Sequence, residues 1–388
     1  MPGPLMRRTA LVTPQHWKGE EMGSYNFFGT GSANTVSSVV QSSFSTINSG
    51  SIGVPSSMSM VGAVKPTFAP LMQTLSTQGL TPTVAQFLNA ANAEYTTSGT
   101  PPDMQPFMQY GLIPIAETNN TTGMAAKAYL TTQGQVIIAY QGTSGGDNLL
   151  NNFGILGAQL SADGTIYTGK ISTAQTNALT FAQQVVQYAN SVGIASSDVF
   201  VTGHSLGGIE AEYVAQQTGL GGIGFESTGI PTSTTAVGNG SNFINIVTYG
   251  DPVGSYASDV QGLQPYAPAY VPGQAGALPH FGQVVLIGDP SAQATLTKDV
   301  ATFNEAAAAK GQITGGNLGD LLNLAGGVIN YHLPGVQAHD LGVTLSPVSF
   351  TADHIGVMTG PVFQASSMTI SQFLQSYSAA NPGQVYMG

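Results

Sequence analysis

Residues 198–219 read DVFVTGHSLGGIEAEYVAQQTG, and this stretch decides the fold class. Its first part, Asp198–Thr202, has the apolar run expected of a short buried strand. Its second part, Ile209–Gln217, has helical spacing and is followed by a glycine that can end the helix. The turn between them is Gly203–Gly208, with Ser205 near its centre. A strand that leads directly into a helix is the repeating unit of α/β proteins, so we predict this class.

The same alternation of strands and helices extends along the chain. Apolar residues at helical spacing after Thr81-Pro82 predict a helix to about Tyr95, and a second helix is predicted over Ser172–Ser191. Two further strands are expected to form a hairpin: Met124–Leu130 and Gln135–Tyr140. Later strands are expected at Gly222–Phe225, Phe243–Tyr249 and Gln283–Ile287, and a later helix at Asp299–Lys310. This pattern predicts a mostly parallel central sheet with helices on both faces.

The chain divides into a weakly patterned beginning and a well-patterned remainder. Residues 1–75 are polar and rich in serine and glycine, so we expect a polar N-terminal extension ahead of a folded domain over 76–388. No run approaches the roughly 18 consecutive apolar residues of a membrane helix. The first residues also lack the apolar core of a signal peptide.

Charged residues are scarce, at 7% of the chain against roughly 25% in an ordinary globular domain. The 8 basic and 19 acidic residues give a net charge of −11, which argues against binding nucleic acid or an anionic membrane. The absence of cysteine excludes disulfides, thiolate metal sites and a cysteine nucleophile. A surface with few lysines and much glycine, serine and threonine suggests a secreted, extracellular protein.

A G-x-S-x-G motif occurs twice, at Gly203–Gly207 and at Gly142–Gly146. In enzymes with a nucleophile elbow, this motif exposes a serine on a tight turn between a strand and a helix. Ser205 has that context, whereas Ser144 precedes two glycines and an aspartate, which is typical of a loop. The alternative for Ser205 is an ordinary helix N-cap serine. Ser205 is therefore the candidate nucleophile.

A nucleophilic serine needs a histidine base oriented by a carboxylate, and in proteins with this elbow the chain order is Ser, Asp or Glu, His. Asp251 directly follows the strand Phe243–Tyr249 and Gly250, where the carboxyl end of a strand presents a side chain. Asp259 and Asp289 remain rival candidates for the acid. The histidines that follow in the chain, and so could be the base, are His280, His332, His339 and His354.

The sequence GHSLGG between a strand and a helix, with an apolar strand ending in Gln141-Gly142-Thr143 about sixty residues earlier, resembles the class 3 lipase family of α/β-hydrolases. The resemblance covers roughly residues 110–345 and implies an α/β-hydrolase fold for the catalytic domain expected over 76–388. It also implies that the backbone amides of Thr143 and Leu206 form the oxyanion hole. Gln141 stands where many relatives have arginine.

The resemblance also favours one histidine. The segment Tyr331–Leu341 is similar to the family's segment in which the base precedes a small helix, and it places His332 in the catalytic position. Three other histidines remain alternative candidates for the base: His339, His354 and His280. Any of them that is not the base is expected to be a surface or hydrogen-bonded structural histidine. The implied triad is Ser205, Asp251 and His332, with no metal or organic cofactor.

The expected activity is hydrolysis of carboxylic esters, of the lipase or phospholipase type, with an ester or lipid substrate and transient contact with a lipid interface. Three alternatives stay open: an esterase for short-chain or polyester substrates, acyl transfer to an alcohol, and an inactive surface or adhesion protein on a hydrolase scaffold. Apolar residues hinged by glycines in Gly145–Gln159 suggest either a lid or a buried connecting helix. Oligomeric state does not follow from the sequence.

Overall fold

The structure is a computed structural model of the 388-residue chain, and it describes residues 81–96, 99–143, 162, 165–166, 169–231, 233, 235–260, 278–298, 328–347 and 360–388. Several expectations concern residues outside these ranges. They include the N-terminal extension and its boundary at residue 75, the possible lid Gly145–Gln159, the helix Asp299–Lys310, and the candidates Ser144 and His354.

Within the described residues, a nine-stranded sheet has the order β1-β5-β6-β7-β8-β9-β10-β11, and β4 also pairs with β5. Strands β6 to β10 run parallel, and the pairings at both edges are antiparallel. The strands are β1 (Met104–Pro106), β4 (Ala116–Thr118), β5 (Ala125–Thr131), β6 (Val136–Tyr140), β7 (Val199–His204), β8 (Gly221–Phe225), β9 (Phe243–Thr248), β10 (Gln283–Ile287) and β11 (Val385–Met387).

The fold is therefore of the α/β class, and the sheet is mixed rather than mostly parallel. The sequence did not reveal the edge strands β1, β4 and β11 because each has three residues, too few to show a period of two. The predicted hairpin is confirmed as β5 and β6, with Ala126 opposite Tyr140 and Leu130 opposite Val136. A separate two-stranded hairpin joins β2 (Met108–Gln109) to β3 (Ile113–Pro114).

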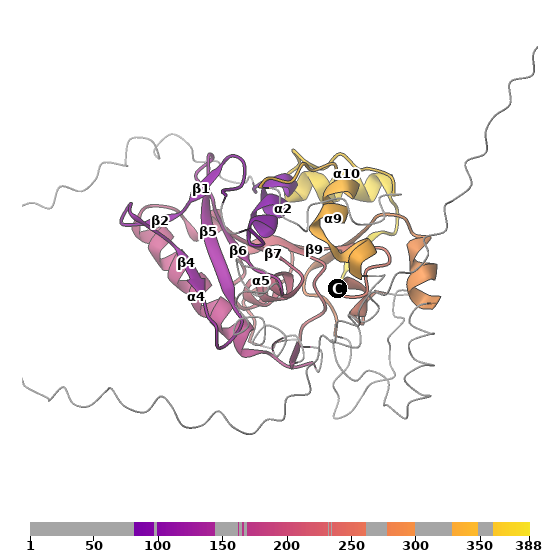
Figure 1. The fold of residues 1–388 in the computed structure, drawn as a ribbon, viewed down its shortest axis with the longest axis horizontal. Helices are drawn as coiled ribbons and strands as arrows, with labels where there is room; N and C mark the ends of the chain where they lie inside the picture. The colour runs from indigo at the N-terminus through magenta and orange to yellow at the C-terminus, as the bar shows by residue number, and fades with distance from the viewer. Residues whose placement is uncertain are drawn as a thin grey trace, which may run out of the picture. The chain divides into compact units, whose positions relative to one another are not determined.

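Helices cover the sheet on both faces. Figure 1 shows α4 (Thr173–Ser191) and α5 (Leu206–Thr218) on one side, and α2 (Val84–Ala93), α9 (Pro334–Asp340) and α10 (Ile370–Ala380) on the other. The predicted helices over Ser172–Ser191 and Ile209–Gln217 are confirmed as α4 and α5.

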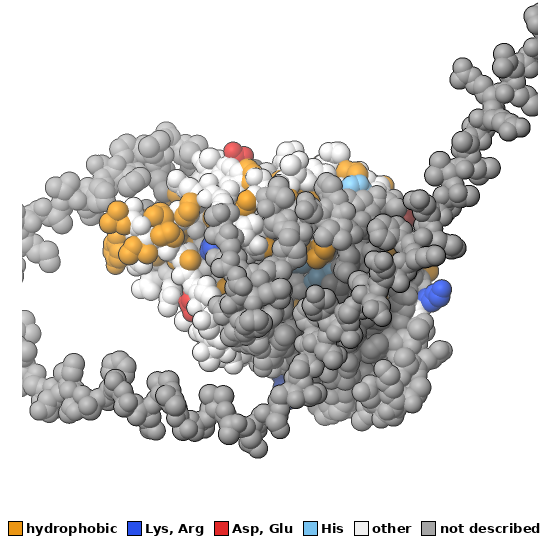
Figure 2. Space-filling view, viewed as in Figure 1, with side chains coloured by type: hydrophobic (Ala, Val, Ile, Leu, Met, Phe, Trp, Pro, Cys, Tyr) orange, Lys and Arg blue, Asp and Glu red, His pale blue; other side chains and the backbone are white. Residues whose placement is uncertain are grey.

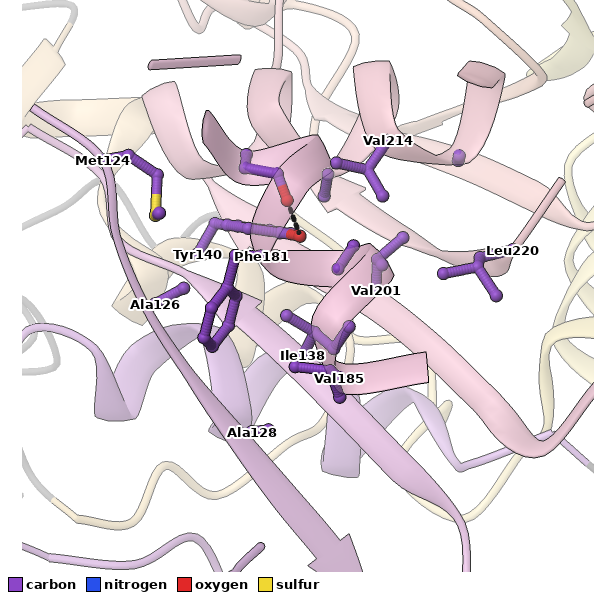
Figure 3. Close-up of a cluster of buried hydrophobic side chains, with 14 of the residues drawn as sticks. Met124, Ala126, Ala128, Ile138, Tyr140, Phe181, Val185, Val201, Val214 and Leu220 are labelled. Carbon is purple, nitrogen blue, oxygen red and sulfur yellow. Dashed lines mark hydrogen bonds between the residues drawn. The ribbon is translucent and has the colours of Figure 1, made fainter. Parts of the chain in front are cut away.

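The central strands are buried on both faces, as their continuous apolar runs predict. In β6, Ile138 and Tyr140 pack under α4 and α5, while Ile137 and Ala139 pack on the opposite side. Figure 3 shows the first of these two cores, where the Tyr140 hydroxyl donates a hydrogen bond to the carbonyl of Ala178 at 3.0 Å. Burial of this kind contributes roughly 25 cal/mol per Å² of apolar surface and fixes β6 beside β7.

The first described helix begins two residues later than predicted. Thr83, rather than Thr81, is its N-cap: the Thr83 side chain accepts from the N–H of Gln86, and the Gln86 side chain accepts from the N–H of Thr83. This reciprocal pair satisfies two amides that a helix start would otherwise leave unpaired. The hydroxyl of Thr81 instead accepts a hydrogen bond from the N–H of Ile370 at 2.9 Å.

On the face shown in Figure 2, the described residues present few charged side chains, as the composition of the chain leads one to expect. Hydrophobic side chains gather over the β2–β3 hairpin, where Tyr110, Leu112 and Ile113 are exposed. None of the helices that the structure describes combines the length and apolar character needed to span a membrane.

The topology places the segments that follow four parallel strands at one edge of the sheet. Parallel strands present their carboxyl ends at the same edge. The residues that follow β6, β7, β8 and β9 include, in this order, Thr143, Ser205, Glu226 and Asp251. Chemistry-bearing side chains from separate parts of the sequence therefore converge here.

Candidate active site

Ser205 lies at the tip of a sharp turn between β7 and α5. Its φ of +59° and ψ of −127° are strained for a residue with a side chain, and such strain is typical of a functional position. Its N–H donates to the carbonyl of Phe225 at 2.9 Å, which fixes the turn. Ser205 is the N-cap residue of α5 by position, but its side chain makes no capping hydrogen bond to the helix. Its hydroxyl instead lies 2.9 Å from Nε2 of His332.

The glycines of the motif are required by close backbone approaches. A Cβ atom on Gly207 would collide with the carbonyl group of Tyr140. A Cβ atom on Gly203 would collide with the backbone of Gly207 and lie 2.8 Å from the backbone nitrogen of Gly208. The G-x-S-x-G spacing therefore allows α5 to start tightly against β6 and β7, with the half-buried Ser205 at the turn between β7 and α5.

His332 ends the π-helical turn η3 (Val328–His332), directly before α9. Its Nδ1 lies 3.0 Å from Oδ1 of Asp251, and its Nε2 lies 2.9 Å from Oγ of Ser205. Because a carboxylate only accepts, Nδ1 carries the hydrogen and donates the hydrogen bond to Asp251. Nε2 is then free to accept from the Ser205 hydroxyl. π-helical turns are frequent at functional sites, and this one supports the same inference.

Asp251 is fully buried at the end of β9 and is held in its anionic form. Its carboxylate accepts from the N–H of Val253 at 3.2 Å and from the N–H of Gly254 at 2.7 Å. Burial by itself would raise the pKa of Asp251, but the charge and hydrogen bond of His332, with the bonds from Glu226 and Gly254, lower it below its usual range. The structure thus brings the three predicted triad residues together.

The rival residues make other contacts. Nδ1 of His280 lies 3.1 Å from Asp259, and the ion pair raises the pKa of His280 and lowers that of Asp259 against the opposing effect of burial. Asp289 accepts from the N–H of Ser291 in a turn. His339 pairs with the neighbouring Asp340 at 3.0 Å.

A supporting set of contacts that the sequence did not reveal holds the backbone of His332. Nε2 of His204 lies 2.6 Å from the carbonyl oxygen of His332, and Nδ1 lies 2.7 Å from the hydroxyl of Tyr95. Burial and the neighbouring His332 lower the pKa of His204 to about 3, so its ring is neutral. A neutral ring has one N–H, which the carbonyl requires at Nε2, so Tyr95 donates to Nδ1. The Gln337 amide also donates to the His332 carbonyl, at 3.3 Å.

Glu226 is a second buried carboxyl group at the site, and the sequence analysis did not single it out. Its signal was the same as that of Asp251, an acidic residue directly after a strand. One potential metal-ligating atom from each of Glu226, Asp251 and His332 lies within 4.8 Å of the other two, close enough for the three to hold a metal ion. A cation there would have to take Nδ1 of His332 from its hydrogen bond to Asp251.

The two predicted oxyanion-hole residues follow the adjacent strands β6 and β7. Leu206 is the first residue of α5, where backbone amides have no acceptor within the helix. Tyr140 pairs with Gly203 in parallel register, so the chain that continues to Thr143 leaves β6 beside the elbow. A Cβ atom on Gly142 would lie 2.6 Å from the carbonyl oxygen of His204, which shows how closely the two turns approach.

Comparison with known proteins adds little to this geometry. No family model matches the sequence, and no match is found among curated proteins. A solved structure that it resembles weakly is the extracellular lipase LipA from Serratia marcescens, with 19% identity and a TM-score of 0.28. The match covers 40% of this chain and 29% of that chain, so it spans less than a third of the lipase.

Proposed function

We propose that the protein is a serine hydrolase that cleaves carboxylic esters, of the lipase or phospholipase type. One observation carries the proposal: the series Ser205 Oγ, His332 Nε2, His332 Nδ1 and Asp251 Oδ1, joined at 2.9 Å and 3.0 Å. A hydroxyl, an imidazole and a buried carboxylate in this order are the parts of a Ser-His-Asp triad.

The reaction follows from the protonation states of these groups. Ser205 attacks the ester carbonyl while Nε2 of His332 takes its proton, and Asp251 stabilises the imidazolium. The backbone amides of Thr143 and Leu206 bind the developing oxyanion. His332 gives the proton to the departing alcohol, which leaves an acyl group on Ser205. Water, deprotonated by the same histidine, then releases the carboxylic acid and restores the hydroxyl.

The proposal includes an α/β-hydrolase fold of the class 3 lipase type. The elbow between β7 and α5, the acid after β9 and the base beyond β10 support this proposal, since they occur in the order Ser, Asp, His. The filled triad also favours an active enzyme over an inactive scaffold. The composition of the chain, poor in lysine and free of cysteine, supports secretion.

Hydrolysis of a p-nitrophenyl ester series with short to long acyl chains tests the proposal. The wild type is expected to turn over these esters, and Ser205→Ala is not. Activity that rises for long chains above the solubility limit supports a lipase acting at an interface. Activity confined to soluble short esters contradicts the lipase assignment and leaves an esterase. A wild type without activity on any chain length contradicts the proposal as a whole.

A further inference from the structure

Glu226 stands at the end of β8, between the strands that lead to Ser205 and Asp251. Its φ is +51°, in the left-handed region that residues with a side chain rarely adopt. Its N–H donates to the carbonyl of Ile246 on β9 at 3.0 Å. Strain of this kind persists where the surrounding structure requires it, and here it accompanies a side chain bound to β9.

The carboxyl group of Glu226 is fully buried and faces that of Asp251. Its Oε1 accepts from the N–H of Thr248 at 2.9 Å and from the Thr248 hydroxyl at 2.5 Å. A Cβ atom on Gly254 would lie 2.8 Å from Oε2 of Glu226 and 3.1 Å from Oδ2 of Asp251. The two carboxyl groups therefore meet beside Gly254, where a larger residue would intrude on both.

Two carboxyl groups this close, and shielded from water, do not both ionise, because their repulsion is unscreened. Asp251 is the better anion, since it accepts from Nδ1 of His332 and from two backbone amides. Glu226 accepts only from Thr248 among the hydrogen bonds of the described residues. Burial and the charge of Asp251 raise the pKa of Glu226 well above its usual range. The proton therefore resides on Glu226.

We propose that Glu226 is a positioning residue of the triad: its neutral carboxyl group donates a hydrogen bond to Asp251 and holds that carboxylate against Nδ1 of His332. The inference rests on the proposed function, because it assigns Glu226 a part in the same site. It extends the triad to a series of four groups, Ser205, His332, Asp251 and Glu226. The proton stays on Glu226 throughout, so the proton balance of acyl transfer is unchanged.

Two substitutions at Glu226 separate this role from simple packing. Glu226→Gln keeps a donor for Asp251 and an acceptor for Thr248, whereas Glu226→Met has a similar length and neither. Loss of one hydrogen bond to a charged group predicts that kcat of Glu226→Met falls by roughly 10- to 100-fold, with KM little changed. We expect kcat of Glu226→Gln to stay at least tenfold above that of Glu226→Met. Glu212→Gln, at a buried carboxyl outside the site, is the control and is expected to keep wild-type kcat.

A second measurement does not depend on turnover. The downfield proton NMR signal of the His332 Nδ1–H group reports its hydrogen bond to Asp251. We expect this signal in the wild type and in Glu226→Gln, and expect it to be lost or shifted upfield in Glu226→Met. If Glu226→Met does not fold, Gly254→Ala takes its place, since its Cβ atom would separate the two carboxyl groups.

The outcomes distinguish this inference from the proposed function. An unchanged NMR signal in Glu226→Met or Gly254→Ala, or equal kcat in Glu226→Gln and Glu226→Met, overturns the positioning role. If the three proteins show the expected NMR pattern but the wild type hydrolyses no ester, the proposed function alone is overturned. The pattern itself then still supports the hydrogen bond from Glu226 to Asp251.

Discussion

The imidazole of His204 donates a hydrogen bond from Nε2 to the backbone carbonyl of His332, 2.6 Å away. The residue before the candidate nucleophile thus holds the main chain of the candidate base. The two rings also approach each other, with centroids 4.8 Å apart. Because His204 stays neutral, with a pKa lowered by burial and by His332 to about 3, this support persists at neutral pH.

Removal of the Tyr95 hydroxyl tests this support. Tyr95→Phe leaves the buried Nδ1 of His204 without its donor, which costs about 1–3 kcal/mol in the free energy of unfolding. We also expect kcat to fall several-fold, because the neutral tautomer of His204 loses the bond that selects it. Urea unfolding and ester hydrolysis measure the two effects. Tyr110→Phe, on an exposed tyrosine, is the control, and equal stability of the two variants would contradict the assignment.

The choice of base is tested by three alanine substitutions. His332→Ala removes the group that accepts the Ser205 proton, so we expect kcat/KM to fall by about 10⁴-fold or more without loss of the folded state. His339→Ala removes a partly exposed side chain paired with Asp340 and is expected to retain activity. Loss of turnover in His354→Ala, with activity kept in His332→Ala, would show that the assignment is wrong. Circular dichroism verifies folding in each case.

The candidate site was partly predictable because its signals are local. Ser205 follows from a motif set between a strand and a helix, and Asp251 follows from its place after a strand. The preference for His332 came from family resemblance, since residue type alone did not separate it from His280, which instead pairs with Asp259. Tyr95 could not be predicted, because its contact with His204 joins residues 109 positions apart.

A substitution at the elbow tests the backbone argument. A Cβ atom on Gly207 would collide with the Tyr140 carbonyl, so Gly207→Ala must displace β6 or α5. We expect a loss of roughly 1–3 kcal/mol in the free energy of unfolding and a large loss of kcat. Gly111→Ala is the comparison without a clash: its Cβ atom has open space, and the φ of +71° adds a backbone cost that Gly207 in α5 does not carry. Full activity in Gly207→Ala, measured by ester hydrolysis, would contradict the inference that the turn requires glycine at this position.

Glu212 makes the stability of the fold depend on pH. Burial raises its pKa from 4.5 to about 8, partly opposed by the charge of His280 and the N–H of Phe281. The folded state then binds a proton that the unfolded state releases, so stability present below pH 4.5 declines as pH rises towards 8. The slope reaches about 1.4 kcal/mol per pH unit.

The matching experiment is urea unfolding of the wild type and Glu212→Gln across this pH range. Glutamine cannot ionise, so we expect the free energy of unfolding of Glu212→Gln to fall less steeply with pH than that of the wild type. Relative to the wild type, the variant is therefore more stable at pH 8 than at low pH. Glu117→Gln, the same exchange on edge strand β4, is the control. Parallel pH curves for the wild type and Glu212→Gln would exclude this role.

The strands and helices of the fold were predictable where the apolar pattern of the sequence is long. They were less predictable where tertiary contacts determine where an element begins. The runs that became β6, β9 and β10 are mostly apolar, so they predict buried central strands. The start of α2 was misplaced because both Thr81 and Thr83 are suitable N-caps. The choice between them depends on Ile370, whose N–H engages Thr81 from the other end of the domain.

Covalent labelling with a fluorophosphonate, followed by mapping of the modified peptide, tests whether Ser205 is an activated nucleophile. An activated serine attacks this reagent, whereas an ordinary hydroxyl does not. We expect stoichiometric labelling of the wild type at Ser205, retained labelling in Ser144→Ala and none in Ser205→Ala. Labelling that persists in Ser205→Ala, or a wild type that is not labelled at pH 8, would contradict the assignment of Ser205 as the nucleophile.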